Sequence, residues 1–372
     1  IYLPFMNTVN SKYFQTKLLL WHRTINNRDL PWKEEKDVYF IWLSEIILQQ
    51  TRAAQGLKYY ERFVKAYPTI QNLANAPLED VYKLWEGLGY YNRCRNLHAT
   101  SKKIVSELKG QFPKTYESLL ELKGVGPYTA SAIASFAYNL PHAVVDGNVF
   151  RVLSRFFGIE EATDSIKGKK VFEKLATDCL AKNTSAIYNQ AIMDFGATIC
   201  KPENPFCTTC VMKRKCFAYQ NDMVASLPFK EKKVKQRSRW FVYYILNKEG
   251  KFAVQERKAK DVWQHLFEFP LKEFGSEIEW KNFLKTKDSV LLPIDILTDN
   301  YRLLGITKNV SQKLSHQTIH AAGVMVSLPS TKTKKHLQFE WKTAAQLKKL
   351  PFPRIIHLLF NNQVLELFAR VV

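Results

Sequence analysis

The feature that most limits how this chain can fold is a group of four cysteines within residues 200–216, in the order Cys200-x6-Cys207-x2-Cys210-x5-Cys216. Four thiolates so close in sequence can hold one [4Fe–4S] cluster or one tetrahedral zinc ion. A zinc ribbon typically has two separated C-x-x-C pairs, and this stretch has one. The spacing therefore favours an iron–sulfur cluster and leaves zinc open. In a reducing compartment such clustering favours a metal site over disulfides.

The chain is strongly basic. Its 372 residues include 55 Lys and Arg against 34 Asp and Glu, which gives a formal net charge of +21. A charge of this size indicates a polyanionic partner, and nucleic acid is the first candidate. The cysteine stretch itself carries Lys213, Arg214 and Lys215. We therefore predict that a metal-stiffened basic loop contacts DNA phosphates.

The sequence shows no membrane or export signal. No apolar run reaches the ~18–20 residues that a membrane-spanning helix needs. The N-terminus also lacks the basic-then-apolar order of a signal peptide. We predict an intracellular, cytoplasmic protein that works in a reducing environment in association with the nucleoid and not with a membrane.

Two different patterns divide the chain. Residues 11–220 have apolar side chains at helical spacing, for example from Tyr39 to Val64. Lys230 to Arg239 contains six Lys or Arg among ten residues, which is typical of an exposed linker and of a phosphate contact. Trp240 to Leu246 is aromatic and β-branched, and Lys251 to Gln255 can pair with it as a hairpin. The sequence predicts a mostly helical domain over residues 7–229, a linker over 230–239 and an α+β domain over 240–372.

A glycine-rich turn joins two of the predicted helices. The sequence from Leu122 to Thr129 contains Gly124 and Gly126, which allow a tight turn before the next helix begins. The free backbone N–H groups at that helix start can bind a DNA phosphate without reading the base sequence.

Glu45 is a candidate general acid. Its neighbours at i−4 and i+3 on a helix are Ile41 and Leu48, so the carboxylate lies on an apolar face. Burial disfavours the charged form and raises the pKa of the side chain, as a proton donor at neutral pH requires.

Asp146 is a candidate partner acid with the opposite charge state. It precedes a helical pattern that starts at Gly147 and is therefore predicted to be the N-cap of that helix. Backbone N–H groups at the helix start would hold the carboxylate ionised. One neutral and one charged acid is a known division of labour in catalysis.

These residues, together with several short motifs, resemble the helix-hairpin-helix DNA glycosylases, and among them most closely the MutY group of adenine DNA glycosylases. The resemblance covers about residues 18–220. Besides the hairpin and the four cysteines, it rests on Leu30-Pro31-Trp32, Trp42-Leu43-Ser44-Glu45, Leu48-Gln49-Gln50-Thr51, Gly87-Leu88-Gly89-Tyr90-Tyr91 and Val145-Asp146-Gly147-Asn148.

The resemblance implies a fold and a cofactor. Two helical subdomains would hold the base pocket between them. One would be a six-helix barrel over about residues 30–140. The other would carry one [4Fe–4S] cluster and consist of the N-terminal helix with about residues 141–220.

The resemblance also implies a reaction, the acid-catalysed release of a flipped adenine. Glu45 would protonate adenine N7, and Asp146 would stabilise the positive charge that develops on the sugar. Tyr128 and Asn148 would flank the sugar and position the water. The other implied roles are DNA wedges for Gln50 and Tyr90 and adenine-pocket walls for Trp32, Leu48 and Gln190, while the role of Lys33 stays open.

Two alternatives compete with this assignment. Endonuclease III, a relative with the same implied fold and cluster, uses a nucleophilic Lys at the position of Tyr128 to cleave the DNA strand. A tyrosine has no amine for this Schiff-base chemistry, so a bifunctional glycosylase and lyase is disfavoured. The non-enzyme alternative is an iron–sulfur DNA-binding sensor, which would not need Glu45 paired with Asp146.

The C-terminal domain resembles, more weakly, the MutT-like domain of the same family. Phe267-Glu268-Phe269-Pro270 resembles its strand entry, but no Arg-Glu followed by Glu-Glu occurs after Pro270 to hold the magnesium of a Nudix hydrolase. Leu314-Ser315-His316 resembles the family loop that recognises 8-oxoguanine, with Leu314 in place of Phe. The implied substrate is double-stranded DNA with adenine opposite 8-oxoguanine or guanine, bound by a monomer.

Overall fold

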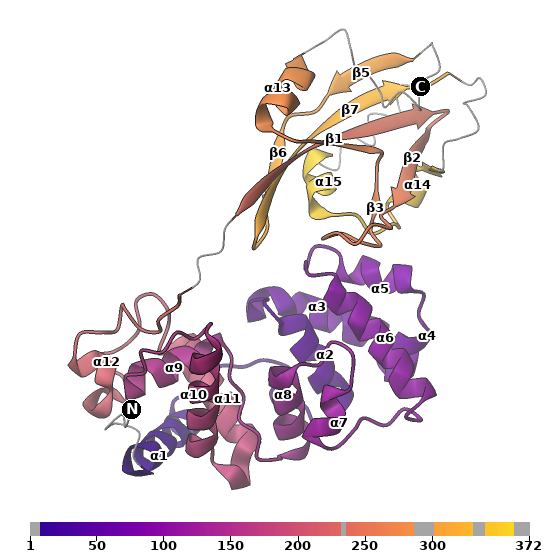
Figure 1. Cartoon of the computed structure of the whole chain (residues 1–372). Helices are drawn as coiled ribbons and strands as arrows, with labels where there is room; N and C mark the ends of the chain where they lie inside the picture. The colour runs from indigo at the N-terminus through magenta and orange to yellow at the C-terminus, as the bar shows by residue number, and fades with distance from the viewer. Residues whose placement is uncertain (1–7, 232–235, 286–300, 330–338, 361–372) are drawn as a thin grey trace. The chain divides into compact units, whose positions relative to one another are not determined.

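The computed structural model describes residues 8–231, 236–285, 301–329 and 339–360. The chain forms two compact units (Figure 1). The helical unit comprises residues up to 75 and residues 96–233, and the sheet unit comprises residues 76–95 and those from 234 onward. Residues 76–95, which the sequence assigns to the helical domain, thus group with the C-terminal part of the chain.

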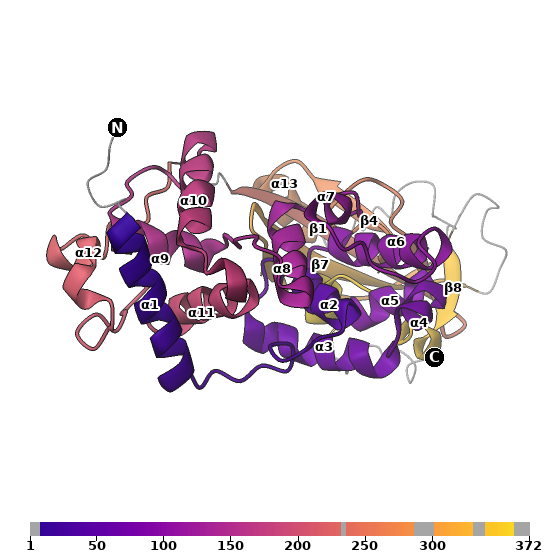
Figure 2. The same cartoon turned by 90° about the horizontal axis from the view of Figure 1, so that it is seen from below.

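The helical unit is built from helices of different lengths that are joined by loops, as the views in Figures 1 and 2 show. The helix α6 (Asn92–Ser106) begins in the segment that groups with the sheet unit and ends in the helical unit. The other helices of the helical unit are α1 (Thr8–Thr24), α2 (Val38–Leu48), α3 (Ala53–Ala66), α4 (Ile70–Asn75), α7 (Tyr116–Leu120), α8 (Pro127–Tyr138), α9 (Gly147–Phe157), α10 (Ile166–Cys179), α11 (Ser185–Thr198) and α12 (Phe217–Gln220), with the 3-10 helices η1 (Lys182–Thr184) and η2 (Lys213–Lys215).

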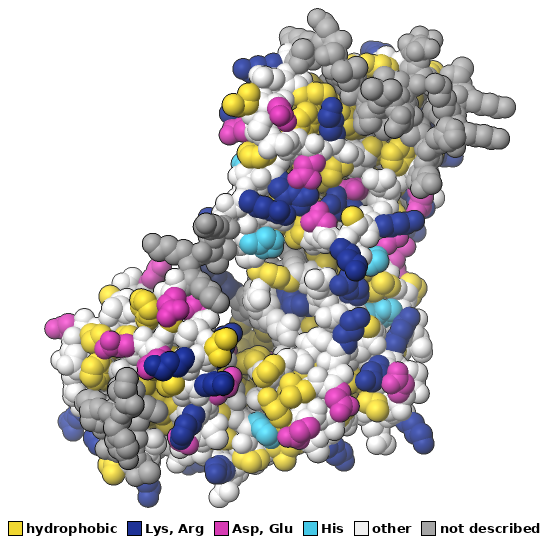
Figure 3. Space-filling model, in the orientation of Figure 1, with side chains coloured by type: hydrophobic (Ala, Val, Ile, Leu, Met, Phe, Trp, Pro, Cys, Tyr) yellow, Lys and Arg dark blue, Asp and Glu magenta, His cyan; other side chains and the backbone are white. Residues whose placement is uncertain are grey.

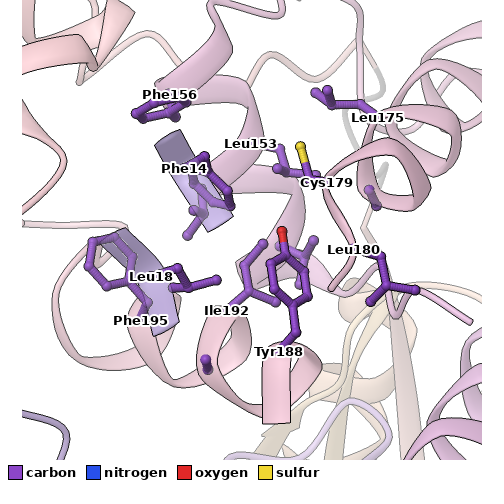
Figure 4. Packing of buried hydrophobic residues seen from close by; sticks show 14 of the residues in the cluster. Phe14, Leu18, Leu153, Phe156, Leu175, Cys179, Leu180, Tyr188, Ile192 and Phe195 are labelled. Atoms are coloured by element: carbon purple, nitrogen blue, oxygen red, sulfur yellow. The ribbon is translucent and has the colours of Figure 1, made fainter. Parts of the chain in front are cut away.

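The N-terminal helix packs against helices from far along the chain. Phe14 of α1 lies 4.9 Å from Phe156 of α9, measured between ring centroids. Leu18 and Phe195 join the same buried cluster, which α10 completes (Figure 4). Burying a side chain of this size contributes ~1.5–3 kcal/mol to folding. This core fixes α9 and α11, whose residues line the cleft described below.

The helical pattern from Tyr39 to Val64 is interrupted in the structure. α2 ends at Leu48 and α3 starts at Ala53. Between them Gln50 has a φ of +54°, in the left-handed region that side chains other than glycine rarely adopt. Apolar spacing alone does not reveal such a break, because the apolar residues continue on both sides of it.

Within its described residues, the sheet unit contains an eight-stranded sheet in which β1 and β7 pair in parallel along β1. The predicted hairpin is confirmed, since β1 pairs antiparallel with β2 and Asn247 lies opposite Phe252. The elements are α5 (Leu78–Trp85), β1 (Arg237–Lys248), β2 (Lys251–Glu256), β3 (Phe267–Glu268), β4 (Leu271–Phe274), α13 (Glu277–Lys285), β5 (Arg302–Ile306), β6 (Val310–Lys313), β7 (Gln317–Ser327), β8 (Glu340–Thr343), α14 (Ala344–Leu347) and α15 (Arg354–Leu359). The predicted fold class, a mostly helical N-terminal part and an α+β C-terminal part, is confirmed.

The basic linker is shorter than the sequence predicts. β1 begins at Arg237, so the last three residues of the predicted linker belong to a strand. The guanidinium of Arg239 donates to both carboxylate oxygens of Glu273 at 2.7 Å and also contacts Asp261. Arg239 is therefore held within the protein and is not a free phosphate contact. Residues 232–235 of the predicted linker lie outside the described residues.

Charged side chains cover much of both units. Figure 3 shows Lys and Arg spread over the visible face, with Asp and Glu interspersed among them. Within the described ranges, no helix combines the length and the apolar character that a membrane span requires.

Candidate active site

A cleft of about 1390 Å³ opens in the helical unit. The C-terminal part of α2, the start of α8, the start of α9 and one face of α11 contribute to its lining. It brings together nine of the residues that the sequence singles out, although they are spread over more than 150 positions: Trp32, Glu45, Leu48, Gln50, Gly126, Tyr128, Asp146, Asn148 and Gln190.

Glu45 lies on the buried face of α2 and is 6% exposed. The pKa of this carboxyl is raised to about 7, mainly by burial and to a smaller extent by the nearby charge of Asp146. A hydrogen bond between the Tyr128 hydroxyl and Glu45 acts in the opposite direction but does not cancel the effect of burial. A large fraction of Glu45 is therefore protonated at neutral pH, as the apolar helix face predicts.

Asp146 is the N-cap of α9, as predicted. Its Oδ1 accepts hydrogen bonds from the backbone N–H groups of Asn148 and Val149, both at 2.8 Å. Its Oδ2 accepts a third from the Asn148 side-chain amide at 2.7 Å. Burial nevertheless raises the pKa of Asp146, because these donors offset only part of the desolvation cost. The hydrogen bonds of the N-cap alone would lower the pKa of Asp146, so the net shift has the opposite direction.

Asn148 is fixed from two further sides. Its Oδ1 accepts from the guanidinium of Arg151 at 2.8 Å. On α11, Gly196 lies so close that a Cβ added there would stand 2.6 Å from the Asn148 Cβ. Any larger residue at position 196 would force a shift between α11 and the start of α9, which carries Asn148.

Tyr128 is the residue that the sequence resemblance places where a lyase would need an amine. It lies in the second position of α8, deep in the cleft, and burial raises the pKa of its phenol well above the usual value. Its hydroxyl also lies 3.6 Å from the Met193 sulfur. The neutral hydroxyl can donate a hydrogen bond, but it cannot form a Schiff base.

A buried carboxylate that the sequence reading missed lies behind the cleft. Asp194 of α11 is fully buried and pairs with Arg28 at 2.7 Å and with Lys33 at 2.6 Å. Its Oδ1 also accepts from the Gln190 side chain at 3.2 Å. Its neighbours at i−4 and i+3 are Gln190 and Ala197, so the apolar surroundings that single out Glu45 do not single out Asp194.

The two residues that are predicted to act as wedges share an unusual backbone conformation. Gln50 in the helical unit and Tyr90 in the sheet unit have φ angles of +54° and +50°. Both side chains are exposed, and 43% of Tyr90 is accessible. The wedge roles of both residues stay predictions.

The glycine hairpin has the predicted form. Gly124 has a φ of +84°, and its Cα approaches Asn96 so closely that an added Cβ would lie 2.8 Å from the Asn96 Cβ. Gly126 precedes Pro127, the first residue of α8. The turn therefore presents the start of α8, as a phosphate contact requires.

The four cysteines of the predicted metal site line one small, mainly apolar cavity. Cys210 accepts from the backbone N–H of Met212, and the guanidinium of Arg155 lies 3.6 Å from the Cys200 sulfur. Across the part of the chain that the structure describes, no group of His, Cys, Asp and Glu side chains has the arrangement of a metal-ion site. An all-sulfur donor set around one cavity fits an iron–sulfur cluster.

The three basic residues of the cysteine loop differ in their contacts with the rest of the protein. Arg214 is exposed, and the Lys213 ammonium donates to the carbonyl of Thr208 at 2.7 Å. The ammonium of Lys215 lies 4.8 Å from the centre of the Tyr13 ring. The loop thus holds two of its three cations in defined positions.

Ser315 and His316 form an exposed turn between β6 and β7 in the sheet unit. The Ser315 Oγ lies 3.2 Å from the His316 Nδ1. The backbone N–H of Arg237 donates to the carbonyl of His316, and the Gln236 side chain reaches the carbonyl of Ser315. The turn therefore lies directly beside the start of β1.

Comparison with known families and structures agrees with this architecture. Residues 43–178 match the HhH-GPD superfamily of base excision DNA repair proteins, and residues 241–362 match the NUDIX domain. A thermostable thymine-DNA glycosylase superposes with a TM-score of 0.53 at 29% identity and covers 57% of this chain and 99% of its own. An endonuclease III bound to DNA gives a TM-score of 0.51 at 22% identity, over 58% of this chain and 98% of its own, which shows a common fold.

Proteins of similar sequence match residues of both units. The adenine DNA glycosylase of Buchnera aphidicola from Acyrthosiphon pisum is 32% identical over 360 residues, which cover 95% of this chain and 98% of the relative. The mouse adenine DNA glycosylase is 42% identical over 228 residues, 59% of this chain and 44% of the relative. Since the first of these matches spans nearly the full length of both chains, this chain belongs to the adenine DNA glycosylase family.

Proposed function

We propose that this protein is a monofunctional DNA glycosylase that hydrolyses the bond between C1′ and N9 of a mispaired adenine during base excision repair. The observation that carries the proposal is Glu45, a buried carboxyl with a pKa of about 7 in the cleft of the helical unit. An acid poised near the working pH is the arrangement that proton donation to a leaving base requires. An iron–sulfur sensor, the non-enzyme alternative, would have no use for it.

Glu45 activates the adenine as a leaving group. The adenine has to leave the base stack first, which costs a few kcal/mol and less for a mispaired base. Glu45 then donates its proton to adenine N7, so the base departs as a neutral molecule when the C1′–N9 bond breaks. The carboxylate that remains is stabilised by the Tyr128 hydroxyl.

The sugar is left with oxocarbenium character, which Asp146 stabilises. Its carboxylate is held in one orientation by three hydrogen bonds, so little reorganisation is needed when the positive charge forms. Asn148 and Tyr128 position the water that adds to C1′. The proton that this water loses passes to the Glu45 carboxylate, which regenerates the acid and completes the hydrolysis.

The adenine pocket uses residues from both sides of the cleft. Trp32 and Leu48 supply apolar walls, and the Gln190 amide supplies a polar group. Asp194 holds Gln190 and Lys33 in place, which gives Lys33 a defined position near the base.

Phosphate contacts come from two places in the helical unit. The start of α8 after Gly124 and Gly126 offers backbone N–H groups, and the cysteine loop offers Lys213, Arg214 and Lys215. Such contacts position the duplex without reading its sequence. The protein acts as a monomer on DNA in the cytoplasm.

A single-turnover assay tests the reaction. We expect adenine release from a duplex with 8-oxoguanine opposite adenine, without strand cleavage until alkali or heat is applied. The control duplex has thymine opposite adenine and should stay intact. Strand cleavage in step with base release would instead indicate a lyase and overturn the monofunctional assignment.

Recognition of 8-oxoguanine is assigned to the Ser315–His316 turn. The lesion differs from guanine by a carbonyl at C8 and an N–H donor at N7. A hydroxyl that accepts from N7–H, or an imidazole near O8, can separate the two bases. Both groups are exposed on this turn, which supports the assignment.

We expect the double variant Ser315→Ala/His316→Ala to lower the preference for 8-oxoguanine:A over G:A about tenfold, because each lost hydrogen bond contributes ~0.5–1.5 kcal/mol. Single-turnover rates and affinities on the two duplexes measure this preference. Ser311→Ala removes an exposed serine from the neighbouring strand and serves as the control. Equal losses on both duplexes would mean that the turn supports the fold and does not read the lesion.

The metal is assigned as a [4Fe–4S] cluster held by Cys200, Cys207, Cys210 and Cys216. The cavity that these thiols share supports this choice. The cluster would stiffen the basic loop. Base release as proposed needs only Glu45, Asp146 and the side chains around them.

Purified protein should be brown, contain about four irons per chain and absorb broadly near ~400 nm from iron–thiolate charge transfer. Cys207→Ala should lose this absorbance and the iron. Cys179→Ala, which removes a buried thiol outside the cavity, should keep both. A colourless, zinc-loaded and fully active preparation would show the assignment to be wrong.

A further inference from the structure

Tyr90, the proposed DNA wedge of the sheet unit, has a backbone conformation that needs support. Its φ of +50° places it in the left-handed region, where a Cβ crowds the backbone. The residue is 43% exposed. Residues with such a conformation persist only where the surrounding structure enforces it, and they concentrate at functional sites.

The peptide planes on both sides of Tyr90 are held by neighbours. The carbonyl of Gly89, which forms the preceding plane, accepts from the Trp85 indole N–H at 3.0 Å and from the Arg93 guanidinium at 3.3 Å. The carbonyl of Tyr90, which forms the following plane, accepts from the Arg93 backbone N–H at 2.9 Å. The rotations about both backbone bonds of Tyr90 are thereby fixed.

The Arg93 side chain also supports the wedge directly. It is 8% exposed, and its guanidinium carbon lies 5.0 Å from the centre of the Trp85 ring and 5.5 Å from that of the Tyr90 ring. Arg93 thus connects a fully buried tryptophan to an exposed tyrosine. A planar guanidinium can stack on aromatic rings while its N–H groups donate to a carbonyl, whereas an ammonium has no plane to stack on the two rings.

We infer that Arg93 is a positioning residue, which holds the Tyr90 ring in the orientation for insertion into the DNA stack. The inference rests on the proposed function and on the wedge role that the resemblance predicts for Tyr90. An ordered wedge enters the stack without first losing conformational freedom, so base flipping is faster. Arg93 itself does not contact the reacting atoms.

The experiment follows unstacking and chemistry in the same complex. The holoenzyme is mixed with a duplex that carries 2-aminopurine next to the target adenine, and the fluorescence rise reports insertion of the wedge. We expect Arg93→Lys to slow this rise and the single-turnover release of adenine by the same factor, tenfold or more. Arg93→Gln is the second variant, and a thermal melt of each shows which is folded.

The control is Arg62→Lys. Arg62 forms the same kind of pair, with its guanidinium 4.3 Å from the centre of the Tyr59 ring, on the surface of α3. We expect neither fluorescence nor adenine release to change in this variant.

A double-mutant cycle with Tyr90→Ala separates positioning from a merely structural role. If Arg93 acts through Tyr90, Arg93→Lys adds no further loss once Tyr90 is alanine. Multiplied losses in the double variant would overturn the inference, as would an unchanged fluorescence rise in folded Arg93→Lys. Failure of the proposed function is distinguishable, because the wild type would then release no adenine. A fully active Tyr90→Ala would reject the wedge role, and this inference with it, but not the proposed reaction.

Discussion

Glu45→Gln lowers the single-turnover rate of adenine release by ~10²–10⁴-fold, the usual contribution of a general acid, and leaves affinity for the mismatched duplex near normal. The amide keeps the shape of the side chain but cannot supply the proton. Glu34→Gln is the matched control, since Glu34 is an exposed carboxylate that lines the same cleft. Substantial adenine release by Glu45→Gln would remove Glu45 from its assigned role.

The pKa of Glu45 also predicts how the rate of adenine release depends on pH. With a pKa of about 7, Glu45 is protonated below that pH and ionised above it. Adenine release by the wild type should therefore be constant in mildly acidic buffer and decrease as the pH rises through about 7. The folded-state pKa lies above the ordinary value of 4.5, so ionisation also costs folding stability. Stability should decrease as the pH rises from about 4.5 towards 7, and Glu45→Gln should abolish that component.

Asp146→Asn is expected to produce the second largest loss, ~10²–10³ in the rate of adenine release, because it removes the negative charge that faces the sugar. Asparagine is as good an N-cap as aspartate, so α9 should still begin at Gly147. Single-turnover rates and a thermal melt together measure the two effects. The rate should decrease far more than the stability.

Ser165→Ala provides the control for the loss of a cap. Ser165 caps α10 and accepts from the backbone N–H of Gly168 at 2.8 Å. Its removal should cost ~1 kcal/mol of stability and leave the rate unchanged. If Asp146→Asn behaved in the same way, Asp146 would be a structural cap only.

The sequence predicts those parts of the site that depend on local structure. The burial of Glu45 follows from its neighbours one helical turn away, and the cap at Asp146 follows from the residues directly after it. The hairpin at Gly124 is equally local. Each of these features needs only the residues within about one turn of a helix.

The remaining parts depend on contacts between distant segments. Asp194 meets Arg28 across 166 positions of the chain, and no periodicity in either segment points to the other. Arg239 shows that ion pairs between distant segments are also not visible in the sequence. A run of basic residues looks exposed in sequence, because the carboxylate of Glu273 that neutralises it lies on a different strand.

The position of the Ser315–His316 turn beside the start of β1 determines how this protein can be divided into pieces. Gln236 and Arg237 close the turn from the linker side. An isolated C-terminal fragment that starts at Trp240, where the sequence pattern alone would place the boundary, would lose these contacts and the first three residues of β1. A fragment that starts before Gln236 keeps them, so the boundary chosen for expression decides whether the turn retains the shape it has in the whole protein.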